Sequence, residues 1–372
     1  MPCACGGKQR YRGLRKRSVL TMAGELTVRR RYFACECGQS LSPLDEWAGI
    51  GKRSVSEHVR RVVTLAGSTW SFEQAAIKLK ELCQLVTSND MVRAVCNEEG
   101  ERVGQWLRKE AASASKLSAA KGELEFSTDG TSVNTTEGWR EIRLSVLSKR
   151  ESAAAATPAQ WDERVLPEPT ARVGWSMIAD SKRVGARWER MFKHLGVGED
   201  AVLSVIADGA RWIWEQAGER LPSARAEWVV DVYHVSEHLH GCGKALFGEG
   251  TVRAKSWAED RLRELLQYGG PTFIGHLEEL AAGVYPIKGR EALRKLLGYL
   301  RENRDRMWYR ERLAAGRPIG SGLIEGGCKN VLGARLKLNS ARWRVRRAER
   351  MGNLRCLEYS DLWDAYWQSR AA

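Results

Sequence analysis

The chain has 372 residues and is basic, with 60 Lys and Arg against 46 Asp and Glu and a formal net charge of +14. Such a surplus favours a polyanionic partner such as nucleic acid; a basic protein without such a partner is the alternative. No apolar run approaches the ~20 residues of a membrane helix, and the first residues do not begin a signal peptide. Nine cysteines without an export signal indicate reduced thiols in a cytosol. We therefore expect two or three domains and no membrane partner.

The first fifty residues contain two matching cysteine knuckles, each a Cys-x-Cys pair followed by glycine. The four cysteines are Cys3, Cys5, Cys35 and Cys37. Thiolates on two such turns can close a tetrahedral zinc site, so residues 1–50 are predicted to form a zinc-ribbon-like segment. Zinc ribbons usually have Cys-x-x-Cys spacing, and the shorter gap strains chelation by both sulfurs of a pair. A ribbon that has lost its metal, or one cysteine per knuckle acting with other ligands, stays open.

Residues 51–110 have a helical pattern. Val55, Val59 and Val63 recur at helical spacing, and Ser71 has the position of a helix cap. A polar break at 87–90 precedes a further helix that contains Arg93. This outline predicts a helix-turn-helix-like DNA-binding region whose second helix enters a major groove. An ordinary small helical bundle would give nearly the same pattern.

From Gly122 onward, strand patterns alternate with helical ones. Strands are predicted at 124–128, 139–147, 173–179, 202–207 and 228–232, with an Ala/Pro-rich surface excursion at 151–170. Asp129 closes the first of these strands and opens a Gly-Thr-Ser turn, and Asp208 follows the fourth strand in the same way. Turns favour Asp-Gly for backbone reasons alone, so either aspartate by itself carries little information.

A third acidic residue, Glu325, follows a long helical stretch predicted at about 240–316. Two strand-end aspartates followed by a helical glutamate are the means by which an RNase H-like fold gathers oxygen ligands for two divalent metals. We therefore expect an α/β protein. Its RNase H-like catalytic domain would span 120–372 and contain the helical stretch as an all-α insertion.

A basic run follows Glu325 and is the predicted phosphate-binding segment. Its members are Arg335, Lys337, Arg342, Trp343, Arg344, Arg346 and Arg347. If the segment is helical, these cations lie near the metals and hold phosphates there; a solvated helix face is the alternative. Trp343 is the candidate for stacking on a base that has left the duplex, although large apolar rings are ordinarily core residues.

One short motif suggests a different activity. Residues 234–238 read His-Val-Ser-Glu-His, which matches the His-x-x-Glu-His of inverted zinc proteases. Read alone, it suggests a zinc peptidase. The pattern is only five residues long, and the nearby His240 and Asp231 fit equally well as neighbours of the same site.

Taken together, the motifs resemble those of bacterial insertion-sequence DDE transposases of the Kra type and, more distantly, Mutator-like transposases. The resemblance runs from the cysteine knuckles nearly to the C-terminus. It is carried by Asp129-Gly130-Thr131, 207–214, 231–234, 320–325, 338–343 and 362–367, in that order. It implies that Asp129, Asp208 and Glu325 bind two Mg²⁺ or Mn²⁺ ions. It also implies an auxiliary motif of Asp231 and His234 near the cleft, with His234 contacting the transferred strand.

The activity implied by this resemblance is DNA transposition. Phosphodiester hydrolysis at the element ends would free a 3′-hydroxyl, which then attacks target DNA. The implied partners are double-stranded DNA, as element ends and target, and further copies of the chain in a homo-oligomer. The implied location is the bacterial cytoplasm, at the nucleoid. A non-catalytic, transposase-derived protein that only occupies element ends is the alternative from another functional class.

Overall fold

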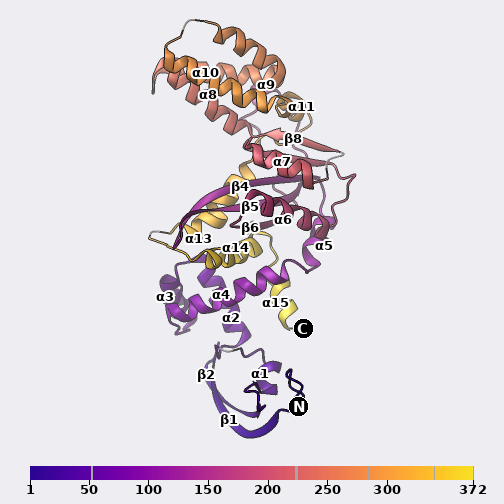
Figure 1. The fold of residues 1–372 in the computed structure, drawn as a ribbon, viewed down its shortest axis with the longest axis vertical. Helices are drawn as coiled ribbons and strands as arrows, with labels where there is room; N and C mark the ends of the chain where they lie inside the picture. Colours follow the sequence, from indigo (N-terminus) through magenta and orange to yellow (C-terminus); the bar gives the residue numbers. More distant parts are fainter. Residues whose placement is uncertain (52, 223–224, 284, 339, 372) are drawn as a thin grey trace.

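The computed structural model describes residues 1–51, 53–222, 225–283, 285–338 and 340–371, so Asn339 of one family motif lies outside the described part. The molecule is elongated, with an N-terminal hairpin at one end and a helical unit at the other (Figure 1). A β-sheet lies between them, next to a second group of helices. Within the described ranges, no helix is both long and apolar enough to cross a bilayer.

The N-terminal hairpin is an antiparallel ribbon with one short extra strand. Its elements are β1 (Arg10–Thr21), β2 (Gly24–Ala34), β3 (Ser40–Leu41) and helix α1 (Pro43–Trp47). The strands follow the order β1-β2-β3. Arg17 and Arg30, one from each long strand, both form ion pairs with Asp45 of α1. These pairs hold α1 against one face of the ribbon.

Four helices follow: α2 (Glu57–Thr69), α3 (Phe72–Cys83), α4 (Asn89–Trp106) and α5 (Ala112–Ala119). The first three begin at serine caps, because the hydroxyls of Ser56, Ser71 and Ser88 each accept a backbone N–H three residues on. The predicted cap at Ser71 is therefore confirmed. A Cβ on Gly100 of α4 would lie 2.4 Å from the carbonyl oxygen of Arg350, so only glycine permits this close helix packing.

The central sheet has five strands in the order β6-β5-β4-β7-β8. Their bounds are β4 (Glu123–Thr135), β5 (Gly138–Arg150), β6 (Ala171–Met177), β7 (Leu203–Ala207) and β8 (Ala226–Val230). Strands β4, β5 and β6 pair antiparallel, whereas β7 pairs parallel with both β4 and β8. Every residue of β7 is buried, as expected for a strand covered on both faces. The chain is thus a mixed α/β protein with a mixed sheet.

Helices cover both faces of the sheet. On one face, Phe126 packs against Trp188 and Phe192 of α6 (Ser181–His194), next to α7 (Arg211–Arg220). On the other face, Leu144 belongs to a core shared with Met351 of α14 (Val345–Tyr359), which also includes buried residues of α2 and α4. The N-terminal helices and the C-terminal segment therefore share one core on this face.

A helical unit separates β8 from the Glu325 segment. It comprises α8 (Val232–Phe247), α9 (Val252–Ala281), α10 (Ile287–Glu302), a short 3₁₀ turn (Arg304–Arg306) and α11 (Tyr309–Ala314). Helix α9 is kinked at Gly269, two residues before Pro271. The helices begin directly after Asp231, earlier than the expected start near residue 240. The reason is that Asp231 caps α8 by accepting the N–H of Tyr233.

The chain then returns to the sheet. Its last elements are α12 (Gly322–Gly326), a π-helical segment (Gly327–Gly333), α13 (Ala334–Leu336), α14 and α15 (Trp363–Ala371). The Ala/Pro-rich segment 151–170 contains only a 3₁₀ turn (Pro158–Gln160). It is tied to α11 and its following loop by backbone hydrogen bonds from Ala153 to Gly316 and from Ala156 to Leu313.

Candidate functional site

Asp129 lies on β4, and Asp208 directly follows β7, the parallel neighbour of β4. Ser127 of β4 pairs with Ile206 of β7, so two further residues along each strand lead to the two aspartates. Backbone N–H groups donate to each carboxylate, from Gly130 to Asp129 at 2.6 Å and from Ala210 to Asp208 at 2.8 Å. Together the strands and these bonds orient both side chains at the point where β7 ends.

The predicted turn after Asp129 is wrong. Strand β4 continues to Thr135 because β5 pairs with it throughout, with Asp129 opposite Leu144 and the hairpin closing only at Thr135 and Gly138. Asp129 therefore sits in the middle of a long strand, level with the end of its shorter neighbour β7. The Asp-Gly sequence indicated a turn, but cross-strand hydrogen bonding overrides that local preference.

The carboxylates of the site repel one another. Burial raises the pKa of Asp129 above its ordinary value, and the negative charge of Asp208 raises it further. Burial also raises the pKa of Glu325, and the charges of Asp231 and Asp129 add to this effect. The raised pKa values of Asp129 and Glu325 mark a place where negative charge is concentrated and a cation would be stabilised.

Glu325, on α12, lies closest to the auxiliary pair. Nδ1 of His234 is 3.9 Å from a Glu325 oxygen and 3.1 Å from a carboxylate oxygen of Asp231. Asp231 is completely buried and accepts hydrogen bonds from the Tyr233 backbone N–H and from the Ser321 hydroxyl. Burial opposes ionisation of Asp231, but the hydrogen bonds from His234 and Ser321 outweigh it, so its pKa lies below the ordinary value. The hydrogen bond between Asp231 and His234 also raises the pKa of His234 to about 9.

The described residues contain one metal-capable group in this region, formed by Asp231, His234 and Glu325, whose ligand atoms lie within 4.8 Å of one another. The sequence-predicted trio of Asp129, Asp208 and Glu325 does not form such a compact group. The two aspartates are adjacent on the sheet, while Glu325 joins the auxiliary motif. Carboxylate oxygens are the ligands that Mg²⁺ and Mn²⁺ prefer, so the donor chemistry of Asp129, Asp208 and Glu325 fits such ions, although the three do not surround a single point.

A tyrosine that sequence reasoning missed also reaches the site. The Tyr299 hydroxyl, from α10, donates to the backbone oxygen of Asp208 at 3.0 Å, and its ring stacks on His238. A Cβ on Gly209 would lie 2.9 Å from this hydroxyl, and the φ of Gly209 is +91°. The Asp-Gly step was visible in the sequence, but nothing there indicated that α10 returns to it.

The stacking of His238 on Tyr299 also bears on the peptidase motif. Among the described residues, His234 shares a metal-capable group with Asp231 and Glu325 and not with His238. Burial and the charge of His234 lower the pKa of His238. The two histidines of the His-x-x-Glu-His motif therefore have different partners.

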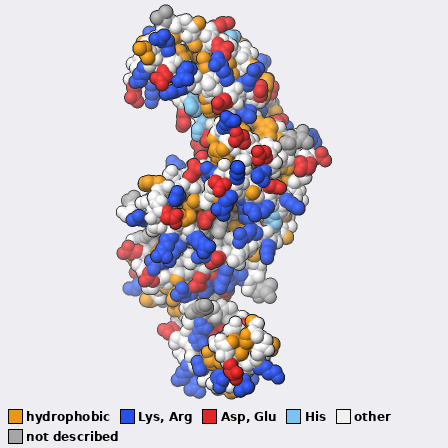
Figure 2. All heavy atoms as spheres, viewed as in Figure 1, with side chains coloured by type: hydrophobic (Ala, Val, Ile, Leu, Met, Phe, Trp, Pro, Cys, Tyr) orange, Lys and Arg blue, Asp and Glu red, His pale blue; other side chains and the backbone are white. Residues whose placement is uncertain are grey.

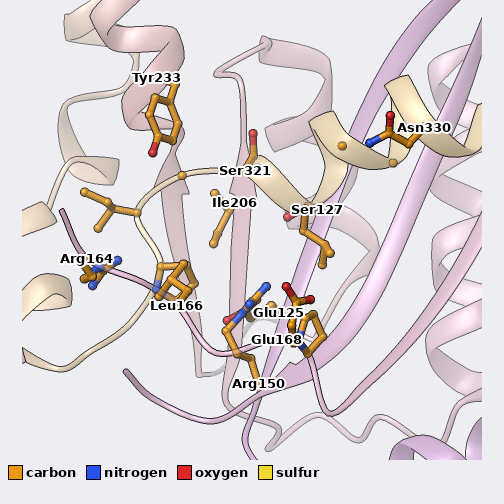
Figure 3. A pocket seen from close by; sticks show the side chains of 18 of the residues that line it. Glu125, Ser127, Arg150, Arg164, Leu166, Glu168, Ile206, Tyr233, Ser321 and Asn330 are labelled. Carbon is orange, nitrogen blue, oxygen red and sulfur yellow. The ribbon is translucent and has the colours of Figure 1, made fainter. Parts of the chain in front are cut away.

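A cavity of about 560 Å³ lies beside the site, although Asp129, Asp208, Asp231 and Glu325 do not line it. Ser127 and Glu125, which share the alternating face of β4 with Asp129, line it together with Ser321 and Tyr233. Glu125, Arg150 and Glu168 gather on one side and Arg164 lies apart from them (Figure 3). The further residues that line it include Ile206, Leu166 and Asn330. Its walls thus mix apolar surface with charge.

The four knuckle cysteines come together at the N-terminal end of the molecule, with all four sulfurs within 4.8 Å of one another. The Sγ atoms of Cys3 and Cys37 are 3.6 Å apart, and those of Cys5 and Cys35 are 3.7 Å apart. Sulfurs of a tetrahedral site, each about 2.3 Å from zinc, would be about 3.8 Å apart. The Cys5 backbone N–H lowers the pKa of Cys3 to about 7. For Cys37, the lowering by the Gln39 backbone N–H is outweighed by the neighbouring thiols of Cys5 and Cys35, which raise its pKa, so the four sulfurs share their charge unequally. The short Cys-x-Cys spacing therefore still permits a four-sulfur site.

Two members of the predicted phosphate-binding run are core residues instead. Arg335 is buried, donates to the Gly67 carbonyl at 2.9 Å, and lies over the rings of Phe72 and Trp343. Trp343 is also buried, and its indole N–H donates to the Leu336 carbonyl. The assignments of Arg335 to phosphate and of Trp343 to an extruded base are therefore wrong, because both side chains join α13 to α2 and α3.

The rest of the run remains accessible. Lys337, Arg342, Arg344 and Arg346 are exposed, and Arg347 is half-buried. Burial lowers the pKa of Arg347, and the charges of Arg344 and Arg93 lower it further. Arg93, on α4, is therefore near enough for its charge to act on Arg347, and α4 packs against α14. Arg93 also forms an ion pair with Asp90 at 2.6 Å.

Comparison of the chain with protein-family models and with curated proteins found no match. An assignment of function to this chain therefore rests on the geometry and chemistry of its own residues.

Proposed function

We propose that the protein is a DNA transposase with an RNase H-like catalytic domain. The observation that carries this proposal is the placement of Asp129, two residues beyond Ser127 on β4, beside Asp208, which directly follows the parallel strand β7; the charge of Asp129 also acts on Glu325. The strand order, with three antiparallel strands followed by two parallel ones, supports the expected fold class. The helical unit between β8 and Glu325 supports the expected all-α insertion.

Asp129, Asp208 and Glu325 would hold Mg²⁺ or Mn²⁺. Two such ions held there would supply Lewis-acid activation of water and stabilisation of the charge that develops on the phosphodiester. The carboxylates supply the negative charge and are oriented by backbone N–H groups. The hydrogen bond to Asp231 raises the pKa of His234 to about 9 in the metal-free site, which favours an imidazolium that can hold a phosphate oxygen of the transferred strand. Asp231 and Ser321 orient that imidazolium from behind.

The reaction proceeds in two displacements at phosphorus. Water attacks the phosphodiester at the element end and the bond to the 3′-oxygen breaks, which frees a 3′-hydroxyl. That hydroxyl then attacks a target phosphodiester, forms the new phosphorus–oxygen bond and releases a 3′-hydroxyl of the target. Neither step requires a covalent protein intermediate, because the carboxylates serve as ligands and not as nucleophiles.

The test is to incubate purified protein with a DNA fragment that carries the ends of its own element. Strand cleavage and joined products that appear with Mg²⁺ or Mn²⁺ and disappear with chelator would support the proposal. Specific binding of the ends without cleavage under any metal condition would instead support the non-catalytic alternative. Zinc-dependent peptide hydrolysis would favour a peptidase that uses His234 and His238.

A further inference from the structure

The β1–β2 ribbon has two faces with different electrostatic surroundings. Side chains alternate between the faces. On the inner face, Arg17 and Arg30 are neutralised by Asp45, at 2.6 and 2.9 Å, and their side chains are only 17% and 12% exposed. These two cations therefore have a role within the fold, which is to hold α1. Arg15, which stands opposite Arg30 on the same face, is exposed and lies over the Tyr32 ring.

The outer face is arranged differently. Lys16 stands directly opposite Arg29, and Arg31 lies two residues further along the same face, opposite Leu14. All three cations are exposed. In the part of the chain that the structure describes, no carboxylate lies within ion-pair distance of any of them. Directly opposed like charges destabilise a two-stranded ribbon, so this cluster costs folding free energy that no described contact offsets.

We propose that the outer face of this ribbon, defined by Lys16, Arg29 and Arg31, binds the backbone phosphates of duplex DNA. The inference rests on the proposed function and adds to it a contact surface remote from the carboxylates. Lys and Arg side chains gather over the hairpin end of the molecule (Figure 2). A two-stranded ribbon fits the major groove of B-DNA. Ser18 and Thr27, which share the outer face, supply hydroxyls beside the cations.

The experiment compares three triple variants of the full-length protein. The ribbon variant carries Lys16→Gln, Arg29→Gln and Arg31→Gln, and the charge-retaining variant carries Lys16→Arg, Arg29→Lys and Arg31→Lys. The matched control, Lys288→Gln, Arg290→Gln and Arg294→Gln, removes the same charge from exposed positions of α10. Binding to duplex DNA with and without element ends is measured without divalent metal over a salt series. Zinc content and the thermal unfolding midpoint are recorded for each protein.

The ribbon variant should bind both duplexes at least about tenfold more weakly. The slope of log affinity against log salt should flatten by about 2.7 for three lost phosphate contacts. The charge-retaining variant should bind normally. The unfolding midpoint of the ribbon variant should be unchanged or higher, because the opposed like charges are gone.

Several results would overturn the inference. Equal weakening by the ribbon and α10 variants would indicate a general charge effect, and unchanged binding would remove the ribbon from the interface while leaving the proposed function intact. Lost zinc or a lower midpoint in the ribbon variant would assign the cations a structural role. Binding to an acidic peptide in preference to DNA would identify a protein partner. If wild-type protein bound no duplex DNA at all, the proposed function itself would fail.

Discussion

At the residue scale, the site is a concentration of negative charge with one fixed cation beside it. The buried Asp231 holds His234 in its charged form, while Asp129 and Glu325 have raised pKa values because they are buried near other carboxylates. The residue types and their order were predictable from the sequence, because acidic residues next to strand patterns are visible there. The closeness of Glu325 to His234 was not, because it depends on how α12 returns to the sheet after the helical unit.

The acidic trio gives the first prediction. Asp129→Asn, Asp208→Asn and Glu325→Gln should each reduce strand cleavage by at least about a hundredfold, because the amide keeps the shape but removes charge where the reaction needs it. Duplex binding should change less than about threefold. Gel assays of cleavage and of binding measure the two effects. A variant that cleaves at near wild-type rate would show that its residue does not belong to the trio.

The pair of Asp231 and His234 gives a pH prediction. Because the folded-state pKa of His234 is raised to about 9, its contribution to stability is fully present below about pH 6.5, the ordinary histidine value, and is lost as the pH rises through about 9. Asp231→Asn should return the His234 pKa towards its ordinary value and flatten this part of the profile. Histidine NMR titration and urea unfolding of metal-free protein measure it. Titration of wild-type His234 near 6.5 would contradict the assignment.

At the element scale, local signals placed most helices and strands but misjudged their ends. The cap at Ser71 could be predicted from the sequence because its hydroxyl accepts a hydrogen bond from a residue only three positions on. The length of β4 was not, because β5 determines it. The burial of Arg335 and Trp343 was equally hidden, since a basic run reads as surface unless the helices that cover it are known. Long-range packing accounts for each of these errors.

The basic run now divides into a surface part and a core part, which should respond differently to substitution. Arg344→Gln, Arg346→Gln and Arg347→Gln together should flatten the salt dependence of DNA binding by about one per lost phosphate contact, with little effect on stability. Arg335→Met should lower the free energy of unfolding by about 1–3 kcal/mol, because the Gly67 carbonyl loses its donor, and leave the salt slope unchanged.

Arg93→Gln should mainly reduce discrimination between element ends and random DNA.

Salt-dependent competition binding and urea unfolding separate these effects. An unchanged slope in the triple variant would mean that this surface is solvated and that DNA lies elsewhere. A flattened salt dependence of DNA binding in the Arg335 variant would show that Arg335 contacts DNA phosphates after all.

The cysteine knuckles give a metal prediction. Purified protein should contain about one equivalent of zinc, because four thiolates complete one tetrahedral site. Cys35→Ser should release it and weaken specific binding to element ends, whereas Cys83→Ser, outside the cluster, should retain it. Elemental analysis of protein purified without chelator measures the content. Absence of zinc from the wild-type protein would favour a ribbon that has lost its metal.

At the scale of the whole molecule, the two ends of the sequence are joined through a buried carboxylate. Glu99 of α4 is completely buried and accepts hydrogen bonds from Arg60 of α2 and from Tyr366 and Arg370 of α15. Arg370 also pairs with Glu57, at the start of α2. The last helix of the chain therefore packs against the N-terminal helices α2 and α4. No local sequence pattern could predict this contact.

This network predicts a large effect of one substitution. Glu99→Ala should lower the free energy of unfolding by about 3–5 kcal/mol, because Arg60 and Arg370 both lose their buried carboxylate and Arg60 keeps only the partly exposed Glu98. Glu101→Gln, which removes a carboxylate paired with Arg350 on a half-exposed site of the same helix, should cost less than about 1 kcal/mol. Urea unfolding of both variants tests the contrast. Equal, small losses would show that the network does not join the ends.

The joining of α15 to α2 has a consequence for the order of events during synthesis. During translation, α2 and α4 leave the ribosome before Tyr366 and Arg370 have been synthesised. Until then, Glu99 can form hydrogen bonds with Arg60 and with water, but not with α15. Helix α4, which carries Arg93, therefore reaches its final stability only after α15 has been translated, and α15 follows Glu325 in the chain. A nascent chain should therefore not engage DNA firmly through this region before its carboxylate trio has also been made.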